Sequence, residues 1–189
     1  MEIGLFASIG VTLFILFSIF FVAFSWRSLP NPRCHGFYRF LAFEAILILI
    51  LINIPFWFRF PLSPLQVVSW LLLLFSIFFV IQGFYLLKKL GGYKARENSS
   101  ETYAFEDTAN LITDGIYKYI RHPLYSSLLL LAWGAYLKHI SIYSTVAVLF
   151  ATGSLIATAK IEERENLSSF GSSYKEYIKK TKMFVPYLF

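Results

Sequence analysis

The densest group of reactive side chains lies in residues 115–125, which read Gly-Ile-Tyr-Lys-Tyr-Ile-Arg-His-Pro-Leu-Tyr. Arg121 and His122 stand directly before Pro123, a residue favoured in the first turn of a helix, and an apolar run follows. Helix N-termini present backbone N–H groups and a partial positive charge to carboxylates and phosphates. The motif therefore predicts half of a cofactor pocket, with Tyr125 one turn inward. Anchoring of a helix end at a membrane surface accounts for the same residue types.

A second candidate group follows a later apolar segment and consists of Glu162 and Glu163. A cytoplasmic flank of a membrane helix is normally Lys or Arg, so two acids at this place are unexpected. Their carboxylates could bind ribose hydroxyls or a cationic ligand, and a helical hairpin would bring them to Tyr117 and His122. An ordinary solvated charged helix surface is the alternative interpretation.

Three further polar positions are weaker candidates. Glu44 lies inside an apolar segment, where an ionisable group suggests function, although Arg39 is near enough for a helix-end ion pair. His35 and His139 are far apart in sequence and in the predicted topology, and Cys34 is the single cysteine. We therefore predict no metal site.

Composition indicates the elements that must position these groups. The chain has 189 residues, of which 57% are hydrophobic, 20% aromatic and 15% charged. Soluble domains carry about a quarter charged residues, and crossing a bilayer takes about 20 apolar residues. The fold class is therefore all-α, a polytopic integral membrane protein. On such a protein the +6 net charge reflects topology, so no nucleic-acid partner is predicted.

We predict a single membrane domain over residues 1–189 with five transmembrane helices. Residues 1–90 form three spans, 91–122 a cytoplasmic loop with the cofactor motif, 123–160 a helical hairpin and 161–189 a cytoplasmic tail. The spans run from about 3 to 25, 37 to 58, 65 to 87, 123 to 137 and 140 to 159. Apolar residues at helical intervals after Ala159 predict a C-terminal amphipathic helix, divided at Gly171.

The distribution of Lys and Arg predicts the orientation. With five spans, every one of the 17 basic residues except Arg59 and Lys138 falls on one side. The positive-inside rule then places the N-terminus outside and the C-terminus, with both candidate groups, in the cytoplasm.

These motifs resemble the isoprenylcysteine carboxyl methyltransferase family, membrane enzymes related to the phospholipid N-methyltransferases. The resemblance covers roughly the C-terminal 80 residues. It is carried by residues 111–117, Arg-His-Pro-Leu-Tyr at 121–125 and Glu162-Glu163, with Leu167, Phe170-Gly171, Tyr174 and Tyr177 following.

The resemblance implies an S-adenosylmethionine-dependent O-methyltransferase. The cofactor contacts that it implies are Ala109, Asn110, Leu111, Ile112, Tyr117, His122, Pro123, Leu124, Tyr125 and Glu163, with Arg121 and Glu162 beside them. It also implies a lipid-like or prenylated acceptor that enters from the bilayer. Lys160 and Tyr125 are candidates for positioning that acceptor.

Two positions depart from the family pattern. Ser127 stands where the family often has glycine. Ala159 stands where the prenylcysteine enzymes have an arginine that faces the acceptor carboxylate, with Lys160 beside it. The cofactor half of the site is therefore better supported than the acceptor half, and phospholipid N-methylation is the first alternative.

Two other functions remain open from the sequence. An NADPH-dependent membrane sterol-type reductase would use a similar His-Pro-x-Tyr stretch, with Lys118, Arg121 and Lys160 available for a 2′-phosphate. A non-enzymatic membrane scaffold or small transporter would need polar residues facing each other inside the spans, which supply few besides Glu44, Asn53 and Gln82.

Overall fold

The computed structural model describes residues 2–92 and 108–187. Residues 93–107 of the predicted loop from 91 to 122, including Lys94 and Arg96, therefore lie outside the described residues. The helices are α1 (Glu2–Ser25), α2 (His35–Asn53), η1 (Ile54–Phe56), α3 (Pro64–Leu90), η2 (Gly115–Lys118), α4 (Pro123–Tyr136), α5 (Ile142–Phe170) and α6 (Ser172–Lys180). The described residues form no β-strand, and the all-α prediction is confirmed.

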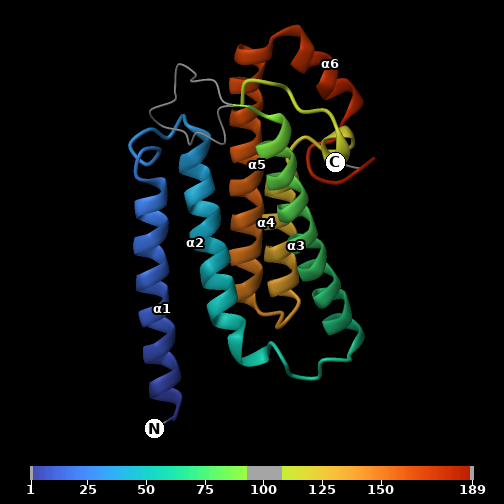
Figure 1. Cartoon of the computed structure of the whole chain (residues 1–189). Helices are drawn as coiled ribbons and strands as arrows, with labels where there is room; N and C mark the ends of the chain where they lie inside the picture. Colours follow the sequence, from blue (N-terminus) through green and yellow to red (C-terminus); the bar gives the residue numbers. More distant parts are fainter. Residues whose placement is uncertain (1, 93–107, 188–189) are drawn as a thin grey trace.

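Figure 1 shows α2, α3, α4 and α5 as a bundle, with α1 alongside α2 at its edge and α6 capping one end. Small residues let the helices approach closely. Ala45 of α2, Ala132 and Ala135 of α4 and Ala151 of α5 share one buried cluster. A Cβ placed on Gly134 would lie 2.9 Å from Leu73 of α3, so this glycine sets the α3–α4 distance.

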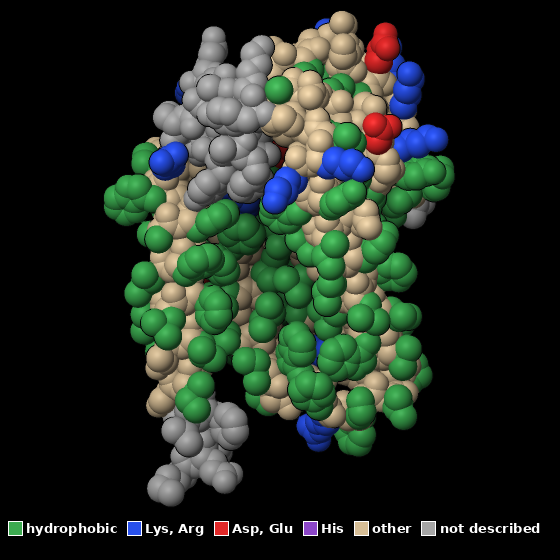
Figure 2. All heavy atoms as spheres, viewed as in Figure 1, with side chains coloured by type: hydrophobic (Ala, Val, Ile, Leu, Met, Phe, Trp, Pro, Cys, Tyr) green, Lys and Arg blue, Asp and Glu red, His purple; other side chains and the backbone are tan. Residues whose placement is uncertain are grey.

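Four helices are long and apolar enough to cross a membrane, namely α1, α2 with η1, α3 and α5. Large apolar side chains such as Leu74 and Phe78 lie 61% and 51% exposed on the bundle flank, where Figure 2 shows mainly hydrophobic surface. The chain is thus an integral membrane protein. The fifth predicted span is α4, whose 14 residues rise about 21 Å against a hydrocarbon core of about 30 Å. Five spans are therefore not confirmed.

The predicted start of α4 at Pro123 is seen, with His122 in a non-helical conformation directly before it. The predicted end of the last span is not marked by a helix end. We expected it near Ala159, but α5 continues without a break to Phe170, because no Gly or Pro interrupts the charged stretch. Only at Gly171, with a φ of +58°, does the chain turn into α6. A separate amphipathic helix beginning after Ala159 is not observed.

Candidate functional site

The Arg121–His122 motif is held by the C-terminal tail. The Arg121 backbone N–H donates to the Lys182 carbonyl at 2.8 Å, and the His122 N–H donates to Met183 at 3.2 Å. In the next turn, the Ser126 hydroxyl donates to the Phe184 carbonyl at 2.9 Å. The tail and the start of α4 are therefore one structural unit.

The Arg121 side chain joins three segments. Its Nε lies 2.6 Å from a carboxylate oxygen of Glu163 on α5, and its Nη1 donates to the Thr181 carbonyl at 2.6 Å. His122 Nε2 lies 3.4 Å from the same Glu163 oxygen. Arg121 and His122 are nearly inaccessible, so Glu163 is a partner for the motif inside the protein.

Glu162 has a different environment from its neighbour. The Tyr125 hydroxyl donates to its carboxylate, and His122 Nδ1 lies 3.9 Å from its other oxygen. The rings of His122 and Tyr125 stack with centroids 5.4 Å apart. The carboxylate, the imidazole and the phenol, which come from two helices, thus form one cluster.

This cluster borders a cavity of about 310 Å³. The predicted residues on its wall are Leu111, Ile112, Tyr117, Arg121, His122, Pro123, Leu124, Tyr125 and Glu162. The predicted residues that do not line it are Ala109, Asn110, Lys160 and Glu163. Within the acidic pair, Glu162 lines the cavity and Glu163 bonds Arg121, and the cofactor contact expected at Glu163 stays a prediction.

Four tyrosines contribute to the cavity wall: Tyr117, Tyr125, Tyr174 and Tyr177. Burial raises the pKa of the Tyr117 phenol, and the nearby Glu162 charge raises it further. Burial likewise raises the pKa of Tyr174 and Tyr177 on α6. These three phenols therefore stay neutral across the physiological range, and Tyr177 donates to the Tyr117 carbonyl at 2.6 Å.

Sequence reasoning missed one side of the cavity. Arg39 and Phe43 of α2, Phe24 of α1 and apolar residues of α3 close it opposite the motif. The spacing of Arg39 and Phe43, four residues apart on one helix face, was the available signal. The sequence also suggested an ion pair between Arg39 and Glu44. In the structure, Glu44 instead accepts a 2.7 Å hydrogen bond from Ser18 of α1.

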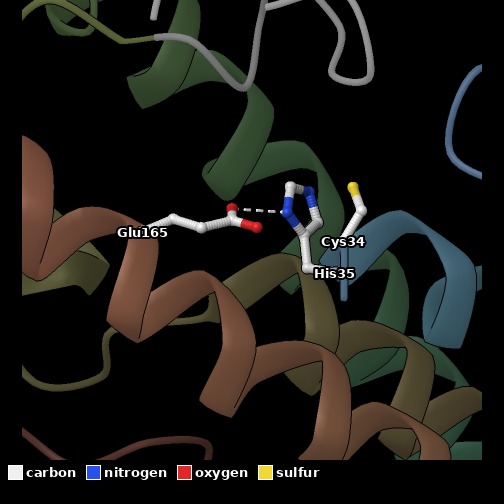
Figure 3. Close-up of side chains that lie close together, drawn as sticks. All are labelled: Cys34, His35 and Glu165. Atoms are coloured by element: carbon white, nitrogen blue, oxygen red, sulfur yellow. Dashed lines mark hydrogen bonds and ion pairs between the residues drawn. The ribbon is translucent and has the colours of Figure 1, made fainter. Parts of the chain in front are cut away.

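A Cys/His/Glu cluster lies beside the site, drawn in Figure 3. The cluster consists of Cys34, His35 and Glu165, and the possible ligand atoms of these three side chains lie within 4.8 Å of one another. His35 Nδ1 and the Glu165 carboxylate are 2.7 Å apart, a hydrogen-bond distance. Nitrogen and oxygen ligands about 2.0–2.2 Å from one tetrahedral zinc would stand about 3.3 Å apart. The arrangement is thus a hydrogen bond tying α2 to α5, and the absence of a metal stays a prediction.

Ala159 of α5 is fully buried, in a cluster with Ala42 of α2 and Tyr125 of α4. It offers no polar atom to an acceptor, and its neighbour Lys160 is exposed on the outer surface of α5. Neither position therefore places a polar side chain on the cavity wall, and the role of Lys160 in positioning an acceptor stays a prediction.

The fold and site define a helical membrane protein with a charged, aromatic cavity at one end of its bundle. Residues 65–173, more than half of the chain, match the family model described as phospholipid methyltransferase. The chain belongs to this family and is a membrane methyltransferase. The searches of curated proteins and of solved structures each found no match.

Proposed function

We propose that the protein transfers a methyl group from S-adenosylmethionine to a lipid-like acceptor within this cavity. The observation that carries the proposal is the placement of Glu162, His122 and the tyrosines on one cavity wall, inside the matched region. The family favours a methyltransferase over the reductase and scaffold alternatives.

The residues present fit this cofactor. A cavity of about 310 Å³ is in the range of small-molecule sites, which start at about 300 Å³. S-adenosylmethionine supplies a methyl group activated on a cationic sulfonium. The ring faces of Tyr117 and Tyr125 would contact the positively charged sulfonium, and the Glu162 carboxylate would accept hydrogen bonds from the ribose hydroxyls. The N-terminus of α4 with His122 would bind the cofactor carboxylate.

Two acceptors are compatible with the site. The sequence motif favours the carboxylate of a C-terminal isoprenylcysteine, whose oxygen needs no base. The family match favours the amine of a phospholipid head group. An amine must lose its proton before its lone pair can attack, so this acceptor would need a base that a carboxylate acceptor does not need. Ala159, which is buried and apolar, adds weight to the phospholipid.

We further propose that α4 counts as a short fifth crossing, with the N-terminus outside and the site in the cytoplasm. Figure 1 supports this, since α1 starts at the opposite end of the bundle from α6. In Figure 2 the Lys and Arg side chains gather mainly at the α6 end. The same proposal includes the domain layout predicted from the sequence. In that layout the loop, the hairpin and the tail all contribute to one site.

Calorimetric titration of the purified protein with S-adenosylhomocysteine and with NADPH tests the cofactor. We expect S-adenosylhomocysteine to bind, and Glu162→Ala and His122→Ala to weaken binding at least about tenfold. Glu176→Gln, which alters an exposed acid of α6, is the matched control and should bind normally. If NADPH binds and S-adenosylhomocysteine does not, the proposal is overturned.

A second experiment separates the acceptors. The protein receives a donor with a labelled methyl group, together with N-acetyl-S-farnesylcysteine or phosphatidylethanolamine. Label that becomes volatile after mild base is a methyl ester and identifies the carboxylate acceptor. Base-stable label in the lipid identifies N-methylation.

A further inference from the structure

Arg39 is a buried cation on the cavity wall that the proposed cofactor contacts do not use. Its side chain lies one turn inside the start of α2 and is 5% exposed. The guanidinium carbon lies 5.6 Å from the centre of the Phe24 ring on α1, within the range of a cation–π contact. Packing thus fixes the position of this charge at the cavity.

The depth of Arg39 suits the boundary between head groups and hydrocarbon. The start of α2 lies at the same end of the bundle as the end of α5, since His35 bonds to Glu165. One turn further along α2, about 6 Å deeper, Phe43 also lines the cavity. Val80 and Phe84 of α3 continue this apolar wall. A molecule with an anionic group above an apolar tail would match the wall in both respects.

The cavity wall also carries charges of both signs. Arg39 and Arg121 are the basic Lys or Arg side chains among its described lining residues, and Arg121 is bonded to Glu163 and Thr181. Arg39 faces Glu162 and Tyr125 closely enough to interact electrostatically with both. The Glu162 carboxylate suits a cationic donor, and the Arg39 guanidinium suits an anion.

We propose that Arg39 binds the anionic group of the methyl acceptor and so determines acceptor specificity. The proposal rests on the proposed function, because it assumes that donor and acceptor share this cavity. The planar guanidinium can donate two parallel hydrogen bonds to a carboxylate or to a phosphate. Both acceptors considered above carry such a group: the isoprenylcysteine its carboxylate, the phospholipid its phosphodiester beside the amine.

The test measures how tightly the full-length protein binds two anions with one alkyl chain, dodecyl phosphate and dodecanoate. The protein is held in maltoside micelles, and its donor site is saturated with S-adenosylhomocysteine. Native protein, Arg39→Gln, Arg39→Lys and the control Arg33→Gln, which alters an exposed arginine of the α1–α2 loop, are compared. We expect Arg39→Gln to weaken binding of one anion at least about tenfold, because a charge-assisted hydrogen bond is lost. Arg39→Lys should keep part of the affinity, and Arg33→Gln should match the native protein.

The outcomes distinguish the two proposals. A preference for the phosphate identifies a phospholipid-type acceptor, and a preference for the carboxylate identifies a prenylcysteine-type acceptor. Equal anion binding by native protein and Arg39→Gln overturns the role of Arg39, even if S-adenosylhomocysteine binds. Failure of S-adenosylhomocysteine to bind the native protein overturns the proposed function instead. In turnover, the Arg39→Gln variant should show a raised KM for the acceptor and an unchanged affinity for S-adenosylhomocysteine, which a loss of folded protein would not produce.

Discussion

The two ends of the helical bundle carry similar residues that are arranged in different ways. At the end opposite α6, Asn53 donates to the Ala135 carbonyl at 2.9 Å and accepts from Ser144 at 3.1 Å. The Lys138 ammonium lies 3.3 Å from the centre of the Trp70 ring, and His139 stacks on Phe56 with ring centres 3.7 Å apart. These side chains join helices to one another.

At the α6 end, Arg121 and Glu163 likewise join elements, but Glu162, His122 and Arg39 border a cavity. Both ends of the bundle therefore carry a histidine, a lysine or arginine, and aromatic residues. The difference is that the side chains named at one end pack against neighbouring helices, whereas those at the α6 end border a ligand-sized space. Residue type alone thus does not distinguish an anchor from a site.

The largest difference between the ends is expected from Glu162→Gln, which removes a charge while keeping the shape of the side chain. Because the proposed donor is cationic, we expect kcat/KM for methyl transfer to fall at least about tenfold through weaker binding of the donor. The affinity for S-adenosylmethionine should fall more than that for S-adenosylhomocysteine, which lacks the sulfonium charge. Calorimetry and initial rates measure both. Equal losses for the two ligands would show that the charge of Glu162 does not act on the sulfonium.

The second prediction concerns the opposite end. Asn53→Ala leaves the Ala135 carbonyl and the Ser144 hydroxyl without their buried partner, so we expect it to lower the free energy of unfolding by about 1–3 kcal/mol. The affinity for S-adenosylhomocysteine should not change. Thermal unfolding followed by circular dichroism, together with calorimetry, gives the two quantities. A weaker affinity in this variant would mean that the two ends are coupled.

Features that depend on residues close together in the sequence were predictable, and contacts between residues far apart in the sequence were not. The start of α4 at Pro123 and the turn at Gly171 follow from local rules on proline and glycine, and both are seen. The continuity of α5 to Phe170 was not predicted, because the change in apolar pattern after Ala159 was interpreted as a new amphipathic helix, although Glu, Arg and Lys favour continuing one.

The cavity required knowledge of contacts that no local pattern contains. Neighbouring residues in a helix point in directions about 100° apart, so the sequence does not tell whether Glu162, Glu163 or both face one ligand. Which of them does so depends on the docking of α4 and the tail against α5. Arg39 was missed for the same reason, since α2 meets the motif only through tertiary packing.

A pair of glycines on the α3–α4 contact gives a smaller contrast between the ends. A Cβ on Gly83 would lie 2.8 Å from Leu124, a cavity residue, whereas one on Gly134 would lie 2.9 Å from Leu73 and 3.3 Å from the Ser69 carbonyl. We expect Gly134→Ala to destabilise the protein by about 1–3 kcal/mol without changing ligand affinity. Gly83→Ala should displace Leu124 and change the KM for the donor severalfold. Identical effects of both variants on KM would contradict this separation.

The smallest expected effect is a pH dependence of stability that arises at the α6 end. Burial raises the pKa of Tyr177 above its ordinary value near 10, so the folded protein keeps the phenolic proton after the unfolded chain has lost it. Above pH 10 the unfolded state thus binds fewer protons, and stability falls as the pH rises. Tyr177→Phe should cost about 1 kcal/mol at neutral pH, through loss of the hydrogen bond to Tyr117, and should make the decline above pH 10 shallower. Melting temperatures of both proteins between pH 8 and pH 11 measure this, and parallel declines would show that Tyr177 ionises equally in the folded and unfolded states.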